Sequence, residues 1–208
     1  MDEHNFTTVR LSLYGKRLRE LKSSVVFGIT ASVLLFVFAF IIFVSNFVLF
    51  KVYVSGSSMF PTLKSGDILS VNPYLKADYG DVIVISGEEN YWLIKRAIAF
   101  GGDTVKIKDG AVSLKKAGET AFTKLTEPYL DAQVKTVWDD PRADGFLVPE
   151  GQIFYLGDNR KYSKDSRSEF GTCDREQIVG VVSKVALKFK DFNRLLDSIV
   201  SPVKKMLA

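Results

Sequence analysis

The chain begins with one long apolar run and continues with short segments in which apolar and polar residues alternate. No charged residue occurs from Ser24 to Phe50, and the core of the run reads VVFGITASVLLFVFAFIIFV, 25–44. About 20 apolar residues at ~1.5 Å rise per residue cross the ~30 Å hydrocarbon layer of a membrane. The apolar region of a cleavable signal peptide is only ~7–15 residues long, and no A-x-A site follows this run. The pattern predicts a retained transmembrane helix over 24–50.

The basic residues around this run indicate its orientation. Five of them precede it within residues 1–23, whereas Lys51 follows it and the next cation is Lys64. Segments rich in Lys and Arg stay on the cytoplasmic side of a membrane. We therefore expect residues 1–23 to form a cytoplasmic tail and residues 51–208 to lie on the extracytoplasmic side.

Beyond residue 50 the hydrophobic period becomes about two residues, which is typical of strands. The segments with this alternation are 51–54, 67–71, 81–85, 91–98, 104–107, 111–114, 153–156 and 179–187. Asp109-Gly110 separates two of them and is a strong signal for a tight hairpin. No long amphipathic helix interrupts the set. We predict a mostly β fold, with a single N-terminal transmembrane helix followed by an antiparallel β-sheet or barrel domain.

Two parts of the outer region depart from this pattern. Residues 115–149 are more polar and less periodic, and we expect a variable, loosely structured insertion there. Over 190–201 apolar residues recur at helical spacing, which predicts an amphipathic C-terminal helix. Packing of this helix against the β domain is the simpler interpretation, and contact with the outer membrane surface is the alternative.

Charge and cysteine content narrow the function classes. The net charge is +4, and residues 1–23, with five basic and three acidic side chains, supply +2 of it. The remaining +2 belongs to residues 51–208, which gives no electrostatic case for nucleic-acid binding. Cys173 is the only cysteine and cannot form an intramolecular disulfide, so the outer domain depends on its own core.

The stretch VSGSSMFPTL, 54–63, places two adjacent serines, Ser57 and Ser58, in a glycine-containing turn. A serine nucleophile usually needs a histidine base, but the only histidine, His4, lies in the predicted cytoplasmic tail. Lys95, in WLIKR on a predicted strand, is another candidate base. Apolar neighbours disfavour its charged form, and a neutral amine accepts a proton from a hydroxyl. This segment alone is explained more simply if Lys95 extends its amine to the membrane surface or to a sheet edge.

A third segment, GDNRKYSKDSR over 157–167, follows a predicted strand and concentrates acidic, basic and hydroxyl side chains. Such residues are typical of solvated loops. Asp and Arg at short spacing also form rigid ionic frames of the kind that supports a functional site.

Together these segments resemble the bacterial type I signal peptidases, which are membrane-bound Ser–Lys endopeptidases. The resemblance rests on four motifs in order: GSSMFPTL at 56–63, YGDVIVI at 79–85, KRAIAFGGDTV at 95–105, and GDNRKYSKDSR at 157–167 with Gly171. It covers the membrane helix and nearly all of the outer domain except 115–149. A single span and a short insertion are similar to the smaller, single-anchor type of this family.

The resemblance implies a role for each residue of the site. Ser58, directly before the methionine, is expected to be the nucleophile, and Lys95 the general base. Ser163 is expected to hydrogen-bond the Lys95 amine. Supporting ion pairs are implied between Asp158 and Arg96 and between Asp165 and Arg167. The resemblance also implies turns beneath the site at Gly66-Asp67 and Gly80-Asp81.

The same resemblance implies how substrate is held. The oxyanion is expected to accept from the Ser58 backbone N–H. Some members supply a second donor from a serine two places before the nucleophile, where this chain has Gly56, so the Ser57 hydroxyl is a candidate substitute. Val54, Met59 and Ile94 are expected to line a shallow apolar surface that accepts alanine, which gives the A-x-A rule a steric cause. Neither a metal nor another cofactor is implied.

The function implied is removal of signal peptides from secreted preproteins with A-x-A cleavage sites, at the bacterial inner membrane, with membrane lipid but no nucleic acid as a partner. One alternative is a specialised Ser–Lys peptidase of pilus or conjugation assembly. Another is an anchored binding relative without catalysis, which loss of Ser58, Lys95 or Ser163 would indicate, and all three are present. Self-cleaving repressors share the dyad, but they are soluble and carry a DNA-binding domain.

Overall fold

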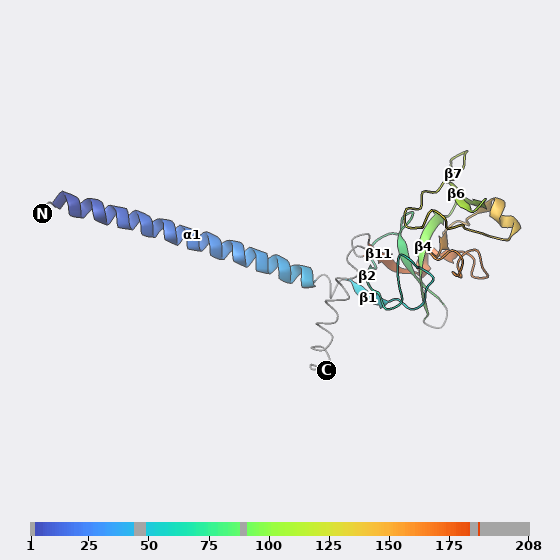
Figure 1. Ribbon diagram of the computed structural model, residues 1–208, viewed down its shortest axis with the longest axis horizontal. Helices are drawn as coiled ribbons and strands as arrows, with labels where there is room; N and C mark the ends of the chain where they lie inside the picture. The colour runs from blue at the N-terminus through green and yellow to red at the C-terminus, as the bar shows by residue number, and fades with distance from the viewer. Residues whose placement is uncertain (1–2, 44–48, 88–90, 184–186, 188–208) are drawn as a thin grey trace, which may run out of the picture. The chain divides into compact units, whose positions relative to one another are not determined.

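The structure is a computed structural model that describes residues 3–43, 49–87, 91–183 and 187 (Figure 1). The chain divides into two compact units, Met1–Val48 and Leu49–Ala208. The predicted C-terminal helix over 190–201 lies outside the described residues.

The first unit contains helix α1, Glu3–Phe43, of 41 residues. Its part Lys22–Phe43 is long and apolar enough to cross a membrane, with a mean hydropathy of 2.8 and no buried residue. The helix begins earlier than the apolar run because residues 3–23 contain no proline and many good helix formers, such as Leu, Arg, Lys and Glu. The predicted helix end at Phe50 is wrong, since Phe50 begins the first strand.

The second unit is built on two antiparallel sheets. The larger has the order β1-β2-β11-β3-β4-β9-β10, and the smaller has the order β7-β6-β5-β8. The strands of the larger sheet are β1 (Phe50–Tyr53), β2 (Ile68–Asn72), β3 (Val82–Ser86), β4 (Trp92–Phe100), β9 (Gln152–Leu156), β10 (Cys173–Asp174) and β11 (Ile178–Val182). Those of the smaller sheet are β5 (Thr104–Lys108), β6 (Ala111–Lys115), β7 (Thr123–Lys124) and β8 (Phe146–Leu147).

The mostly β, antiparallel prediction is confirmed, and each of the eight predicted segments contains a strand. The hairpin between β5 and β6 has Asp109 at φ 53° and Gly110 at φ 81°, as expected of a tight Asp-Gly turn. The two-residue strands β7, β8 and β10 are too short to produce a periodic signal. The last strand was predicted through Leu187, but β11 ends at Val182 and Leu187 is helical.

The larger sheet curls so that its first strand approaches its fifth. β1 and β4 are separated by three strands in the sheet order, yet the rings of Phe50 and Trp92 lie 5.7 Å apart. This curl leaves a groove between two incompletely paired edges. β1 pairs with β2 on one side, and the start of β4 pairs with β3, whereas its pairing with β9 begins only at Arg96.

Residues 115–149, which we predicted to be a variable, loosely structured insertion, contain short ordered elements. This segment forms β7, β8 and the 3-10 helix η3 (Pro141–Asp144). Trp138, Ala143 and Val148 are buried with Phe154 of β9 in a core between the two sheets. A few irregularly spaced apolar residues anchor the segment, which is why hydrophobic periodicity did not detect its order.

Candidate active site

A closed loop presents the two serines directly after β1. The Val54 amide donates to the Asp67 carbonyl at 2.9 Å, and the Gly66 amide donates back to the Val54 carbonyl at 2.8 Å. Gly66 has a φ of 88°, which favours glycine. The Gly66-Asp67 turn predicted from the sequence therefore closes the base of the loop that carries Ser57 and Ser58.

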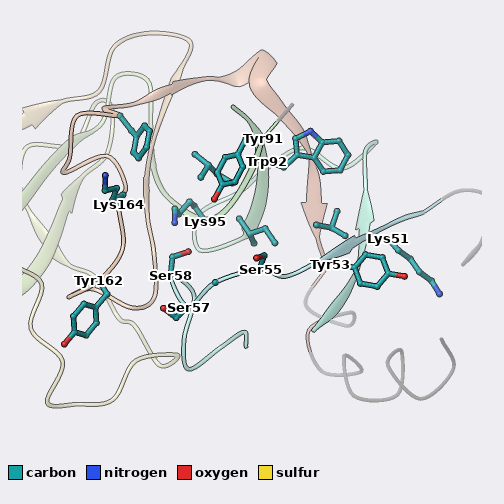
Figure 2. A pocket seen from close by; sticks show the side chains of 15 residues that line it. Lys51, Tyr53, Ser55, Ser57, Ser58, Tyr91, Trp92, Lys95, Tyr162 and Lys164 are labelled. Atoms are coloured by element: carbon teal, nitrogen blue, oxygen red, sulfur yellow. The ribbon is translucent and has the colours of Figure 1, made fainter. Parts of the chain in front are cut away.

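The loop is held from the other side by Asn159. Its backbone amide donates to the Ser58 carbonyl at 2.9 Å, and its side-chain amide donates to the Ser57 carbonyl at 3.0 Å. Ser58 is half-buried and Ser57 is exposed. Figure 2 shows the Ser58 hydroxyl directed toward the Lys95 amine, whereas the Ser57 hydroxyl points away. The backbone therefore presents only one of the two adjacent hydroxyls to the lysine.

Lys95 lies in a strand environment that disfavours its charged form. It pairs with Ile83 of β3 across the sheet, and by alternation it shares a face with Leu93 and Ala97. Only 3% of its surface is exposed. Burial lowers the pKa of the Lys95 amine from 10.5 to about 8, Asp165 and Asp158 oppose this effect, and Arg167 adds to it.

No ion pair neutralises the Lys95 amine within the part of the chain that the structure describes. An amine with a pKa near 8 and no carboxylate partner is neutral in an appreciable fraction of molecules near neutral pH. Lys95 therefore has the protonation behaviour that a general base needs.

Beside Lys95, Arg96 forms a buried ionic contact with the loop after β9. Arg96 Nε and Nη2 donate to the two carboxylate oxygens of Asp158 at 2.8 and 2.5 Å. Its Nη1 donates to the Gly80 carbonyl at 2.7 Å. This bidentate pair is the one predicted from the resemblance, and it ties the predicted Gly80-Asp81 turn to the loop over 157–167.

The second predicted ion pair is also present. Arg167 Nε and Nη2 donate to Asp165 Oδ1 and Oδ2 at 2.8 and 2.9 Å. Asp165 Oδ2 also accepts from the Gly157 amide at 3.0 Å. Both ends of the loop are therefore held by the same carboxylate, which is fully buried.

Sequence reasoning missed a third ionic contact, which comes from 115–149. Arg160 binds both carboxylate oxygens of Glu127 and the Thr136 hydroxyl. Its Nε donates to the Gly157 carbonyl at 3.0 Å. The guanidinium of Arg96 lies 3.6 Å from the ring centroid of Tyr129, a cation–π contact. No local signal in the sequence connects these residues, because they meet only through the packing of the long segment.

Ser163 departs from its predicted contact. Its hydroxyl is buried and has no hydrogen-bond partner in the described part of the chain, so the expected bond to the Lys95 amine is not formed. Ser163 instead packs closely over Gly157. A Cβ on Gly157 would collide with the Ser163 side chain and lie 2.5 Å from the Ser58 carbonyl oxygen. Only glycine at 157 allows Ser163 and Ser58 to approach from opposite sides.

Ser58 and Lys95 share one groove, which we call the catalytic groove, with a volume of about 650 Å³. Figure 2 shows Lys51 and Tyr53 at one end, Tyr162 near the other, and Ser58 with Lys95 between them. Ile94 lines this groove. Val54 and Met59, which we also predicted to face substrate, are 6% and 2% exposed and pack in the core with Leu63 and Val82.

The described residues contain no group of three His, Cys, Asp or Glu side chains close enough to hold a metal ion. Cys173 is a free, buried cysteine on β10, and burial raises the pKa of its thiol to about 12. The thiol is therefore unreactive near neutral pH.

Comparison with known proteins gives the class of this arrangement. Residues 28–187 match the family described as "Signal peptidase, peptidase S26". The chain is 32% identical to signal peptidase I S of Bacillus subtilis, over 73% of this chain and 84% of that protein. It is 34% identical to signal peptidase IB of Staphylococcus aureus, over 74% and 86%.

A crystal structure of a signal peptidase I from Enterococcus faecalis aligns with 52% of this chain and 98% of that chain, at 27% identity and a TM-score of 0.42. The family match and the relatives define the class as a serine peptidase, a hydrolase. More specifically, the chain belongs to the signal peptidase family, peptidase S26.

Proposed function

We propose that this protein is a membrane-anchored endopeptidase that removes signal peptides from secreted preproteins through a dyad of Ser58 and Lys95. One observation carries the proposal: a buried, unpaired amine with a pKa of about 8 lies in the same groove as the serine hydroxyl directed at it. The only histidine of the chain, His4, precedes the apolar helix, so the amine takes the role that histidine has in most serine peptidases.

Acylation begins when neutral Lys95 Nζ accepts the proton of the Ser58 hydroxyl. Ser58 Oγ forms a bond to the carbonyl carbon of the last signal-peptide residue, and the carbonyl oxygen becomes an oxyanion. The tetrahedral intermediate collapses, the peptide C–N bond breaks, and the leaving amine takes the proton from Lys95. A water molecule then loses a proton to Lys95 and attacks the ester carbonyl. The bond between this carbon and Ser58 Oγ breaks, Lys95 returns the proton to Ser58 Oγ, and the signal peptide is released.

The oxyanion accepts a hydrogen bond from the Ser58 backbone N–H, which has no partner among the described residues. A second donor is the Ser57 hydroxyl after rotation about its side-chain bond. Ser163 has the role of directing Lys95: its hydroxyl, buried without a partner, reaches the amine when the site tightens around substrate, as catalytic hydrogen bonds often do.

Substrate binds as an extended strand between the two free edges of the groove. Residues 53–57 approach Ser58 from the same end from which residues 91–94 approach Lys95. In an extended chain alternate side chains point the same way, so the residue before the scissile bond and the residue two before it both face the enzyme. The loop and Ile94 line this part of the groove, and exclusion of larger side chains by them accounts for alanine at both places.

The apolar helix anchors the enzyme in the lipid of the bacterial cytoplasmic membrane, with the N-terminus in the cytoplasm and the β domain outside. The basic residues before the helix support this orientation. The anchor keeps the enzyme at the membrane in which the apolar part of a signal peptide is embedded.

The test is cleavage of a purified preprotein by the full-length enzyme in detergent, followed by sequencing of the product N-terminus. We expect one cut directly after the A-x-A site, no cut with Ser58→Ala, and no cut when both alanines are replaced by phenylalanine. Cleavage by Ser58→Ala, or cleavage at unrelated sites, contradicts the proposal. Cleavage of a pilin-type substrate but not of secreted preproteins would favour the specialised peptidase instead.

A further inference from the structure

A second groove begins where the catalytic groove ends. It has a volume of about 990 Å³ and starts at Phe60 and Pro61, two residues after Ser58. One of its walls comes from 131–139 and the other from 158–168. Tyr162 lines both grooves. The two hollows therefore adjoin at Tyr162, and Ser58 lies in the catalytic groove.

Contacts between the two walls fix the width of the second groove. Arg160 of one wall is 3% exposed, and it binds Thr136 of the other wall in a buried contact and Glu127, which precedes that wall in the chain. Arg167 Nη1 donates to the Val137 carbonyl at 2.9 Å. These bonds join the two walls, so the hollow is preorganised.

We infer that the second groove binds the first residues of the mature protein, on the leaving side of the scissile bond. This inference rests on the proposed function. If the signal-peptide residues lie along 53–57 and 91–94, the chain after the cleaved bond has to leave the site beyond Ser58. Figure 2 shows Lys51 and Tyr53 at one end of the catalytic groove and Tyr162 beyond Ser58, near the other end. The second groove begins at Tyr162.

The chemistry of the second groove fits an extended peptide with apolar side chains at alternate positions. Phe60, at the start of the groove, and Val137, on one wall, are 49% and 57% exposed, a large exposure for apolar side chains. The other apolar lining residues are Pro61, Val134 and Tyr162. Both signs of charge occur at the edges, from Asp131, Asp139, Lys135 and Lys161, without ion pairs in the described part of the chain. Because both signs of charge are present, we expect the second groove to prefer neither positively nor negatively charged substrate residues.

The test uses the full-length enzyme in detergent and two peptides with the same A-x-A signal segment. One ends at the first residue after the scissile bond, and the other continues for six residues with leucine at alternate places. We expect kcat/KM to be about tenfold higher for the long peptide, mainly through KM, because packing of one apolar side chain has an effect of at least that size.

Two variants locate the effect. In Val137→Asp the ratio of kcat/KM between the long and short peptides should fall from about ten to about two, because a charge desolvated by leucine is unfavourable. Leu147→Asp is the matched control: Leu147 is 62% exposed on β8, outside both grooves, and the ratio should stay near ten.

The outcomes separate this inference from the proposed function. Equal kcat/KM for both peptides, with the short peptide still cleaved, overturns the second-groove assignment and leaves the Ser58–Lys95 mechanism intact. Cleavage of neither peptide overturns both. A ratio that falls equally in Val137→Asp and Leu147→Asp, or a change of oligomeric state in Val137→Asp with an unchanged ratio, contradicts peptide binding in the second groove.

Discussion

Replacing Lys95 by methionine should remove activity and, at neutral pH, make the protein more stable. Burial lowers the pKa of the Lys95 amine from 10.5 to about 8, a change that corresponds to roughly 3 kcal/mol of unfavourable interaction with the charged form. Methionine has a similar length and no charge, so it fills the site against Ile83, Leu93 and Ala97 without this penalty.

The pH dependence of the effect has a definite sign. Between about pH 8 and 10.5 the folded chain carries fewer protons on Lys95 than the unfolded chain does, so the stability of the natural protein rises with pH across this window. Below pH 8 the penalty is present in full, and above 10.5 it is absent. The advantage of Lys95→Met should therefore be greatest below pH 8 and shrink steadily above it.

The assay is thermal unfolding of the full chain in detergent, followed by tryptophan fluorescence. Both tryptophans, Trp92 and Trp138, belong to the β domain, so the signal reports that domain. At about 2–4 °C per kcal/mol for a domain of this size, Lys95→Met should raise Tm by about 6–12 °C at pH 7. Lys124→Met, at an exposed position on β7, is the control and should shift Tm little.

The reasoning would be refuted if Lys95→Met had a lower Tm than the natural protein at pH 7 and if the difference in Tm were the same at pH 9.5. It would mean that the amine forms a favourable contact in the folded state and that its charged form is not disfavoured by burial.

Further variants test individual contacts. Ser58→Ala should abolish preprotein cleavage. Ser57→Ala should retain cleavage, with a decrease in rate no greater than the ~10²–10³-fold that follows removal of an oxyanion donor. Complete loss of cleavage in both variants, with both folded, contradicts the assignment of Ser58 as the nucleophile. Gly157→Ala should lower both Tm and kcat, because its Cβ has no room between Ser163 and Ser58, and a normal Tm refutes the close packing. Glu127→Gln should lower Tm by several degrees, since it leaves the buried Arg160 charge uncompensated. The control is Asp140→Asn, which changes the exposed ion pair with Arg142 and should leave Tm unchanged. Ser163→Ala should lower kcat without lowering Tm, because its hydroxyl has no bond to lose in the free enzyme, and an unchanged kcat excludes its role toward Lys95.

The strands and their connections were accessible from the sequence because each depends on local information. Alternation over 81–85 and 91–98 predicts adjacent strands, and Asp109-Gly110 predicts the hairpin through the backbone angles that it favours. The resemblance to a known family added the residue pairs that no local rule supplies, such as Arg96 with Asp158, whose ionic contact the structure contains.

What sequence reasoning missed depends on three-dimensional packing. Val54 and Met59 lie on either side of Ser57 and Ser58 in the chain, and both side chains pack in the core with Leu63 and Val82. Glu127 lies 33 positions from Arg160, in a segment without periodicity. Its contact depends on the packing of Trp138 and Val148, which hold that segment between the sheets.

The central claim is that Ser58 is acylated by substrate with neutral Lys95 as its base, and trapping of the acyl-enzyme tests it most directly. The enzyme would be mixed with an excess of short A-x-A peptide, quenched within one turnover at pH 5–10, digested, and analysed by mass spectrometry. We predict an ester on Ser58 whose formation rate rises with pH around a midpoint of about 8, with no ester in Lys95→Arg, since guanidinium stays protonated. An ester on another residue, or an ester that forms in Lys95→Arg at a comparable rate, would contradict the account.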